Sequence, residues 1–308
     1  MYIDNSSNQS SRQLLTKTIE KIDGAYSPAT IRAYRVDFGD FIKFCDAIDD
    51  VALPASPQSI VEFIIKLTNS GRSSASIRRA IAGIASIHKL NRFSDPTKDP
   101  DVMLEMRRMH RKLGRASNQA LGVTADMLEK LLNATENNIK GIRDRALLLV
   151  GYDTLCRRSE LVSLRIEDVR TKVINGLEST TILLRKSKTD QDANGRWLHL
   201  SKRTQIALDE WLEKLSEDKG QLFRGVNRGD RITQSLGSGQ VNRIYKKIAR
   251  NSEIEKNLIE KISGHSMRVG RAQDLVNSGA SLPIIMSMGR WTKADTVMRY
   301  VEQISFAV

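Results

Sequence analysis

Apolar residues recur at intervals of three and four along most of this chain, and this spacing constrains the fold more than any other feature. Residues three and four apart share one face of an α-helix, so each such stretch predicts a helix with one buried face. Between residues 165 and 200 the pattern changes to short strand-like runs at 180–184 and 196–200, joined by the polar turn 189–195. The sequence therefore predicts a mainly α protein with one small antiparallel sheet.

The predicted helices fall into two groups on either side of residues 114–123, a short polar stretch that reads GRASNQALGV. The first group begins at Ser27 and Pro28, which supply a capping hydroxyl and a proline for the first turn. Three more amphipathic helices are expected before the break, and together the four make a helical bundle. The expected organisation is a disordered polar arm at 1–11, a first helical domain at 12–113, a linker at 114–123 and a second, mostly helical domain with the small sheet at 124–308.

The charge balance favours a polyanionic partner. The chain has 49 Lys and Arg against 36 Asp and Glu, which gives a net charge of +13 and a pI near 9.8. Basic side chains are concentrated at 72–79 and 107–115, where they favour contacts with phosphate. Aromatic residues are only 5% of the chain and do not interleave with the basic ones. Binding to the backbone of duplex DNA is therefore a better expectation than stacking of single-stranded bases.

Signals for a membrane, for secretion and for a metal are missing from the sequence. No apolar run approaches the roughly 20 residues that span a bilayer, and the polar N-terminal stretch lacks the apolar core of a secretion signal. Cys45 and Cys156 lie in apolar helical surroundings and are expected to be reduced, which fits a cytoplasmic protein. The four histidines show no metal-ligand spacing.

The stretch 264–301 carries polar residues in a narrow pattern. His265 and Arg268 stand three apart at the start of a predicted helix, so both project from one face. Trp291 follows within Gly-Arg-Trp-Thr, and Tyr300 comes nine residues after it. Each of the four has an ordinary explanation as a packing or helix-start residue. Together they resemble the second motif of the tyrosine site-specific recombinases, the phage integrase family, and look most like its Cre-type branch.

Two further stretches agree with this resemblance. Arg157 and Glu160 are similar to the family's first motif, in which an arginine and an acidic residue stand three apart. Arg158 occupies a position that is usually apolar in the family, and the spacing to Glu160 favours Arg157 as the matching arginine. Lys188, at the tip of the predicted hairpin, matches the family's hairpin lysine, with the neighbouring Lys186 as a competitor.

The resemblance implies a site-specific recombinase that cleaves and rejoins duplex DNA through a 3′-phosphotyrosine and a Holliday junction. The implied catalytic residues are Arg157 and Arg268 as phosphate clamps, His265 and Trp291 as further donors with His265 also as proton acceptor, Lys188 as general acid, Glu160 as orienting acid and Tyr300 as nucleophile. Two permanently charged guanidiniums suit the oxygens on which negative charge builds. No metal or other cofactor is therefore expected.

The resemblance also implies a clamp around duplex DNA, with helices of both domains in the major groove. The candidate base-reading residues are Thr30, Arg32, Ser76, Arg78 and Arg79 in the first domain and Gln240, Asn242 and Arg243 in the second. The expected partners are inverted-repeat half-sites, bound by a homodimer at each site and by a homotetramer when two sites pair. Phe306 and Val308 near the C-terminus are expected to pack into a neighbouring subunit, with a frayed end as the alternative. The expected location is cytoplasmic and nucleoid-associated, in a bacterium or a mobile element.

Three other functions stay open at this point. The nearest is an integrase that needs accessory proteins. A second is an enzyme like the type IB topoisomerases, which shares the chemistry but relaxes DNA as a monomer. The third is a DNA-binding protein without catalysis on a recombinase scaffold, and the complete set of motif residues argues against it.

Overall fold

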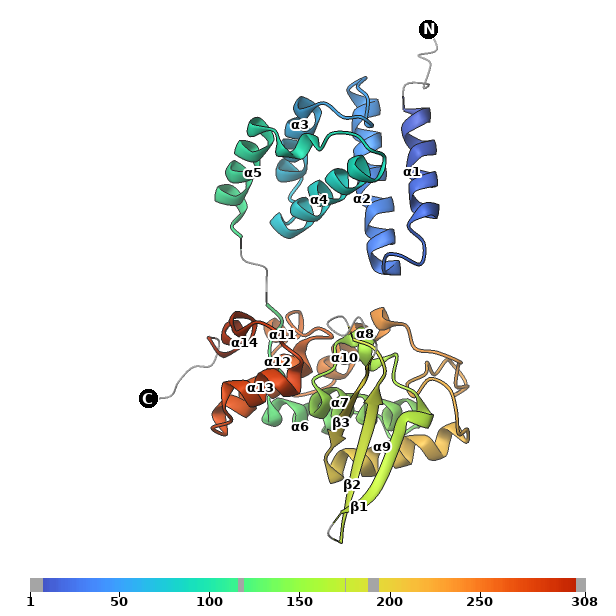
Figure 1. The fold of residues 1–308 in the computed structure, drawn as a ribbon. Helices are drawn as coiled ribbons and strands as arrows, with labels where there is room; N and C mark the ends of the chain where they lie inside the picture. The colour runs from blue at the N-terminus through green and yellow to red at the C-terminus, as the bar shows by residue number, and fades with distance from the viewer. Residues whose placement is uncertain (1–7, 116–118, 175, 188–193, 303–308) are drawn as a thin grey trace. The chain divides into compact units, whose positions relative to one another are not determined.

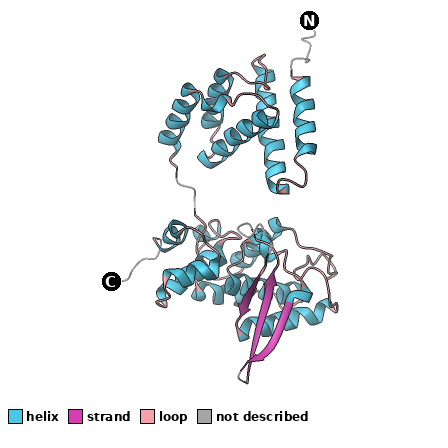
Figure 2. Cartoon of the chain, viewed as in Figure 1, coloured by secondary structure: helices cyan, strands magenta, loops and turns pink. Residues whose placement is uncertain are grey.

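A computed structural model divides the chain into two compact units, Met1–Asn118 and Gln119–Val308. The structure describes residues 8–115, 119–174, 176–187 and 194–302. Helices occur in both units, and the strands lie in the second (Figure 2). None of the helices within these ranges has the length and the apolar character needed to cross a bilayer.

The described part of the first unit is a bundle of α-helices. Its elements are α1 (Gln9–Lys21), α2 (Pro28–Ala47), α3 (Pro57–Asn69), α4 (Ser74–Leu90), the short 3₁₀ helix η1 (Pro96–Lys98) and α5 (Pro100–Leu113) (Figure 1). Polar side chains fix where the helices start, because Ser27, Ser56, Ser73 and Asp99 each accept a hydrogen bond from a backbone N–H of the first turn. A proline follows three of these caps, where its missing N–H costs nothing.

The apolar faces of these helices meet in one core. α2 packs on α4, and α3 packs on α5. Phe38, Phe41, Ile60 and Ile84 are fully buried, and the ring of Phe41 meets that of Phe63 edge-on at 5.1 Å between centroids. Burial of such surface stabilises a fold by roughly 25 cal/mol per Å², so these side chains hold the basic helices in place.

Helix α1 corrects the prediction for the N-terminus. The prediction of a disordered arm is wrong for residues 9–11, because α1 begins at Gln9. The side-chain amide of Asn8 donates to Asp46 at 3.0 Å and to the carbonyl of Asp50 at 2.9 Å, and its oxygen accepts from the N–H of Ala52 at 2.8 Å. The start of the helix is therefore fixed by hydrogen bonds across the unit, which a local sequence pattern does not reveal.

The second unit combines helices with a three-stranded sheet. Its helices are α6 (Ala125–Asn133), α7 (Ile139–Thr154), α8 (Arg158–Leu161), η2 (Ile166–Asp168), α9 (Lys202–Leu215), α10 (Ser238–Arg250), α11 (Lys256–Ile259), α12 (Ser266–Asn277), α13 (Leu282–Gly289) and α14 (Ala294–Val301). Its strands are β1 (Val169–Ile174), β2 (Leu177–Leu184) and β3 (Arg196–Leu200). The prediction of a mainly α chain with one small antiparallel sheet is confirmed.

The sheet has the order β1-β2-β3, and both neighbouring pairs are antiparallel. In the predicted pair, Ile182 of β2 stands opposite Leu198 of β3, and both side chains are buried. Strand β1 was not predicted from the sequence. This edge strand mixes charged residues with valines, and Val173 is 70% exposed, so its sequence does not show a buried face.

Helix α7 is the centre of the second unit. Leu147, Leu148 and Val150 are fully buried, because α6, α8, α9, α12 and β3 surround the helix. Residues 146–152 of α7 are apolar on every side of the helix, and such a stretch is expected to be covered by other elements. The chain leaves α7 directly into the turn that carries Arg157, and α12, which packs on α7, carries Arg268.

Leu121 and Val123 are packed into the second unit, which shortens the predicted linker. The N–H of Leu121 donates to the carbonyl of Lys261 at 3.0 Å, and that of Val123 donates to the carbonyl of Ser266 at 2.9 Å. A Cβ added to Gly270 of α12 would lie 1.8 Å from the carbonyl oxygen of Val123. The sequence predicted a weakly structured segment through residue 123. This is wrong for Leu121 and Val123, because their backbone is hydrogen-bonded to residues 261 and 266 and Val123 packs closely against α12.

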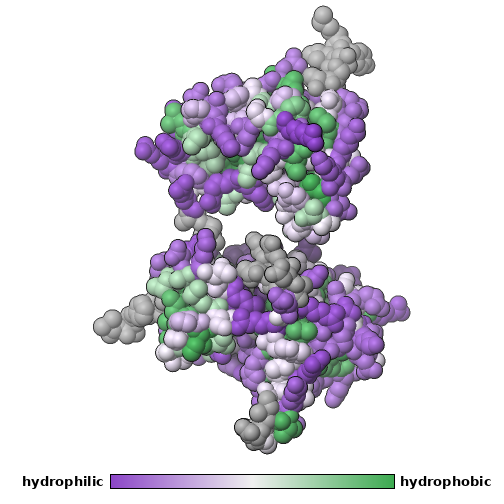
Figure 3. Space-filling model, in the orientation of Figure 1, coloured by the Kyte–Doolittle hydropathy of each residue, from purple (hydrophilic) through white to green (hydrophobic). Residues whose placement is uncertain are grey.

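Apolar side chains also reach the surface of the second unit over α13 and α14, where Figure 3 shows green and pale atoms. Leu282, Ile284 and Met298 are 36%, 54% and 46% exposed. The predicted docking of Phe306 and Val308 lies outside the described residues. It therefore stays a prediction.

His88 of α4 is a fully buried histidine with one assigned tautomer. Its Nε2 accepts the N–H of Ala55 at 2.9 Å, so the ring proton is on Nδ1, which donates to the carbonyl of Ile84 at 2.8 Å. Burial lowers the pKa of His88 below its ordinary value. The folded chain therefore holds this ring neutral.

The stability of the first unit should fall as the pH drops below about 6.5. In this range His88 binds a proton in the unfolded chain but stays neutral in the folded one, so acid favours unfolding. His88→Leu should lower the free energy of unfolding at pH 7.5 by about 1–3 kcal/mol, since the N–H of Ala55 loses its acceptor. It should also weaken the pH dependence. Calorimetry of the full chain at pH 7.5 and 5.5 measures both effects, and an unchanged pH dependence in the variant would contradict this account.

Candidate active site

Predicted site residues from distant parts of the sequence line one cavity of the second unit. Its volume is about 230 Å³, and its walls are Arg157, His265, Arg268, Arg290, Trp291, Thr292, Lys293, Thr296 and Tyr300. These residues come from the turn before α8, from the start of α12 and from the segment between α13 and the end of α14. No group of His, Cys, Asp or Glu side chains suited to a metal ion occurs in the described part of the chain.

Arg157 stands at the start of α8, where a buried acid holds it. Its Nη1 donates to Oε1 of Glu160 at 2.6 Å, and its backbone N–H donates to Oε2 at 3.0 Å. Burial raises the pKa of Glu160, but the bonds from Arg157 and the charge of Arg290 together bring it below its ordinary value, so Glu160 is a carboxylate. Arg158 is exposed and packs against Gly264, and it is not part of the cavity wall. Of these two neighbouring arginines, Arg157 is the one that lines the cavity.

Arg268, in the first turn of α12, is 2% exposed and is held by two helix ends. Its Nη1 donates to the carbonyl of Leu155, just past α7, and its Nη2 donates to the carbonyl of Gly289, the last residue of α13, at 2.5 Å. Carbonyls at helix ends lack helical partners and carry partial negative charge. Burial, and then the charges of Arg157 and Arg290, lower the pKa of Arg268 to about 10, so the guanidinium stays charged at neutral pH. Arg268 also lines the cavity, and a guanidinium has five N–H donors, more than these two bonds use.

Trp291 connects Arg268 to Tyr300. The guanidinium carbon of Arg268 lies 4.1 Å from the centroid of the Trp291 ring, and the ring of Tyr300 lies 5.7 Å from it between centroids. Gln273 of α12 donates from Nε2 to the backbone carbonyl of Tyr300 at 3.0 Å. The half-buried tyrosine is therefore held by its backbone and by its ring.

His265 lies just before α12, at the rim of the cavity. Partial burial, and then the charges of Arg268, Arg158 and Arg157, lower the pKa of His265 below its ordinary value. The imidazole is therefore neutral at pH 7 and able to accept a proton.

Lys188 lies outside the residues that the structure describes, but the strands around it approach the cavity. A second cavity, of about 320 Å³, is lined by Leu184, Ser187, Gly195, Arg196, Met286, Ser287, Arg290, Trp291 and Thr292. Arg196 of β3 donates from Nη2 to the hydroxyl of Ser287 in α13 at 2.7 Å. Lys186 is exposed. Lys293, in the wall of the first cavity, is a lysine that the sequence analysis did not consider.

Arg290 is a further charged residue of the cavity wall that was not among the predicted site residues. Its φ of 57° lies in the left-handed region, which costs a residue with a side chain about 1–2 kcal/mol. Its guanidinium is buried and donates to Glu160 at 3.0 Å. In the sequence, only its position in Gly-Arg-Trp-Thr, between Gly289 and Trp291, pointed to Arg290.

The candidate DNA-binding residues of the first unit differ in whether their side chains are already hydrogen-bonded within the protein. Arg32 on α2 and Arg78 on α4 are exposed. The hydroxyls of Thr30 and Ser76 each bond to the capping serine of their own helix at 2.9 Å. Arg79 makes a forked bond, at 2.7 and 2.8 Å, to a buried aspartate of α2. Arg32 and Arg78 are therefore the most available of the five.

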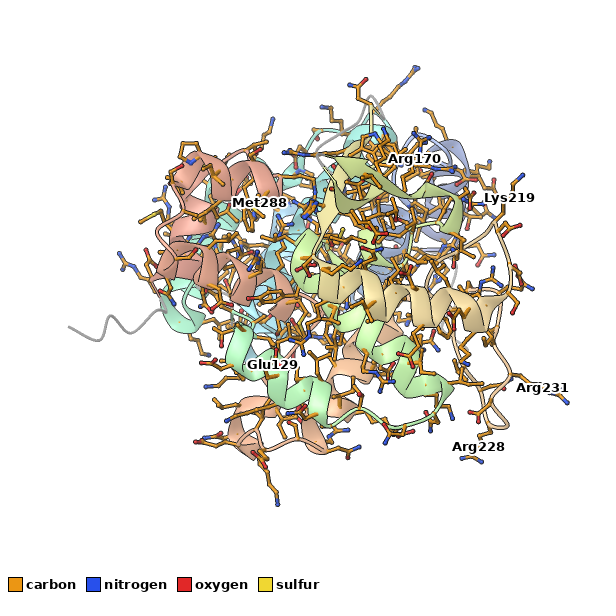
Figure 4. The ribbon with its side chains drawn as sticks, turned by 90° about the horizontal axis from the view of Figure 1, so that it is seen from below. Glu129, Arg170, Lys219, Arg228, Arg231 and Met288 are labelled. Atoms are coloured by element: carbon orange, nitrogen blue, oxygen red, sulfur yellow. The ribbon has the colours of Figure 1, made fainter. Side chains whose placement is uncertain are left out.

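In the second unit, two of the three candidates hold backbone groups. The side-chain oxygens of Gln240 and Asn242 accept from backbone N–H groups at 2.8 and 2.5 Å, whereas Arg243 is exposed. Arg228 and Arg231, which were not among the predicted residues, are exposed and extend from the loop before α10 (Figure 4). These two arginines add exposed positive charge near Arg243 in the sequence.

Comparisons with known proteins give two family matches. Residues 122–305 match the model of the phage integrase family, and residues 21–93 match that of the phage integrase N-terminal SAM-like domain. The chain is 28% identical to an integrase/recombinase XerD homolog of Selenomonas ruminantium, over 98% of this chain and 90% of that protein. It is 25% identical to recombinase Cre of Escherichia phage P1, over 82% of this chain and 77% of that protein.

Solved structures share the fold. The XerH site-specific recombinase bound to its difH substrate matches with a TM-score of 0.62 and 19% identity, over 93% of this chain and 79% of that one. The Tn1549 transposon integrase in complex with transposon right end DNA matches with a TM-score of 0.62 and 14% identity, over 96% of this chain and 95% of that one. These proteins therefore share the fold of this chain with little sequence in common.

Gly289→Ala should disturb this cavity, because a Cβ at Gly289 would lie 1.9 Å from Cζ3 of Trp291. Overpacking of this kind should lower the free energy of unfolding by about 1–3 kcal/mol. Gly239→Ala on α10 is the matched control, since a Cβ there meets nothing within 4 Å and alanine favours a helix. Denaturant unfolding followed by tryptophan fluorescence compares the two, and equal stability would argue against the close contact.

Proposed function

The chain belongs to the phage integrase family, the tyrosine recombinases, and on that premise we propose that its second unit cleaves and rejoins duplex DNA at specific sites. The hydroxyl oxygen of Tyr300 bonds to phosphorus, the bond from phosphorus to the 5′-oxygen breaks, and a 3′-phosphotyrosine remains. Attack by a 5′-hydroxyl of the other duplex reverses the chemistry and forms a Holliday junction. The observation that carries the proposal is the one cavity lined by Arg157, His265, Arg268 and Trp291 together with Tyr300.

The phosphate is held by Arg157 and Arg268. In-line attack on phosphorus builds negative charge on the non-bridging oxygens, and guanidiniums offer paired, permanently charged donors for them. Glu160 holds one of these arginines and helix-end carbonyls hold the other, so neither has to reorganise during the reaction. Donors fixed in this way commonly supply a large part of the rate enhancement. Trp291 and His265 add N–H donors at the edge of the same cavity.

The proton of Tyr300 goes to His265. An ordinary phenol has a pKa near 10, so at pH 7 it needs a base. His265 is neutral at this pH because burial and nearby arginines lower its pKa. The charges of Arg157 and Arg268 also favour the phenolate.

The departing 5′-oxygen receives a proton from Lys188. An alkoxide is a poor leaving group, and a positioned acid typically accelerates such a step by about 10²–10⁴-fold. The strand ends on both sides of Lys188 line the second cavity beside Trp291, which supports this role. Lys293 in the wall of the first cavity is the alternative donor.

The partner is double-stranded DNA with inverted-repeat half-sites, bound by a homodimer and paired in a homotetramer. The net charge of +13 and the exposed Arg32, Arg78 and Arg243 support duplex binding. Solved relatives include a site-specific recombinase bound to its DNA substrate. Arg228 and Arg231 join the candidates for phosphate contact.

Wild-type protein should form a covalent adduct with a nicked site, whereas Tyr300→Phe should form none because it lacks the attacking oxygen. The sites are first selected from a library of inverted repeats by binding to Tyr300→Phe. Denaturing gels report the adduct, and band-shift titration should show equal binding for both proteins. An adduct with Tyr300→Phe would rule out this nucleophile.

Lys188→Ala should slow cleavage by about 100-fold or more, in the range of general-acid catalysis. A substrate with sulphur in place of the scissile 5′-oxygen should largely restore the rate, because a thiol ionises near pKa 8.5 and its thiolate leaves without a proton. Lys186→Ala and Lys293→Ala are the matched controls, and the sulphur substrate should not raise their cleavage rates relative to wild type. Rescue of Lys293→Ala in place of Lys188→Ala would move the acid to Lys293.

A further inference from the structure

Arg290 is the charged residue of the cavity that the proposed chemistry does not use. It follows Gly289, the last residue of α13, and precedes Trp291. Its side chain is 5% exposed, and its backbone has the left-handed φ of 57°, where glycine would be unstrained. A long charged side chain therefore occupies a position where the left-handed backbone disfavours any side chain and where burial disfavours a charge.

Every terminal N–H of Arg290 has an acceptor. Nη1 donates to the carbonyls of Thr154 and Met288 at 3.1 and 3.2 Å. Nη2 donates to the carbonyl of Leu155 at 3.1 Å and to Oε2 of Glu160 at 3.0 Å. The Nε–H group has no acceptor among the described residues, but it is fully buried and so is not exposed to a DNA phosphate. Any effect that Arg290 has on the reaction therefore passes through the partners of its terminal N–H groups.

Glu160 is the partner through which Arg290 reaches the chemistry. Its side chain is 4% exposed. Oε1 accepts from Nη1 of Arg157, and Oε2 is shared between the backbone N–H of Arg157 and Nη2 of Arg290. A buried pair of Arg157 and Glu160 alone would be neutral. With Arg290 on the other oxygen the trio carries one net positive charge, and a buried charge acts strongly over short distances.

Resting on the proposed function, we propose that Arg290 is a positioning residue for phosphoryl transfer. Through Glu160 it fixes the direction of the Arg157 guanidinium, and by sharing the carboxylate it leaves Arg157 with uncompensated positive charge for the scissile phosphate. Arg290 does not touch DNA. Its loss therefore affects bond cleavage and leaves DNA binding in place.

Arg290→Met tests this, because it keeps the apolar stem and removes the charge and the donors. Single-turnover cleavage of a nicked half-site by saturating protein should fall about 100-fold, because Arg157, the preorganised donor to the phosphate, loses its fixed direction. Half-site affinity should be unchanged. Arg203→Met is the matched control, since Arg203 pairs with Glu129 on the surface of the unit, and it should cleave at the wild-type rate.

Two comparisons separate positioning from a general structural defect. If Arg290 acts through Arg157, Arg290→Met adds nothing to the defect of Arg157→Ala. A substrate with a methyl group in place of one non-bridging oxygen lacks the charge that Arg157 neutralises, so on it the defect of Arg290→Met should shrink to about tenfold or less. A structural defect would slow both substrates equally and add to the loss from Arg157→Ala.

Additive defects, equal losses on both substrates, or wild-type cleavage by Arg290→Met would each overturn the proposal and leave the Tyr300 adduct, and so the proposed function, standing. The absence of any adduct with wild-type protein would overturn both. If Arg290→Met does not fold, Arg290→Lys is used for the same comparisons. This variant keeps one positive charge and loses the forked donors of the guanidinium.

Discussion

Two guanidiniums satisfy the unpaired carbonyls at the ends of α7 and α13, and the rest of the site depends on this interaction. Arg268 and Arg290 both donate to the carbonyl of Leu155, and each also donates to a carbonyl at the end of α13. A buried polar group without a partner costs about 1–3 kcal/mol, so the arginines and the helix ends fix one another. The turn that leads to Arg157 and the segment that leads to Tyr300 start from this junction.

The junction also concentrates charge where water is scarce. Arg157, Arg268 and Arg290 surround one carboxylate, and burial together with their mutual repulsion lowers the pKa of Arg268. Such an arrangement is unfavourable for folding by itself, and the surrounding hydrogen bonds and the core around α7 offset it. Fixed positive charges of this kind would stabilise a dianionic transition state. Active sites commonly have such arrangements, which lower the stability of the fold but raise the reaction rate.

Local chemistry in the sequence explains how much could be predicted. Caps, prolines and helical spacing predict most helices, and residue type and spacing singled out Arg157, His265 and Tyr300, which line one cavity in the structure. Interactions between distant segments could not be read in this way. Asn8 orders α1 through contacts with residues more than 30 positions away, and Arg290 acquires its partners only once α7 and α13 meet.

The close approach of Val123 to Gly270 defines where one module can be exchanged for another. From Leu121 onward the backbone is hydrogen-bonded to residues 261–266 and rests on α12, the helix that carries Arg268 and holds the carbonyl of Tyr300 through Gln273. A chimaera that joins a foreign N-terminal module to this chain should therefore have its junction upstream of Leu121. A splice further along would replace residues that pack on α12, and α12 in turn contacts α14, the helix that carries Tyr300.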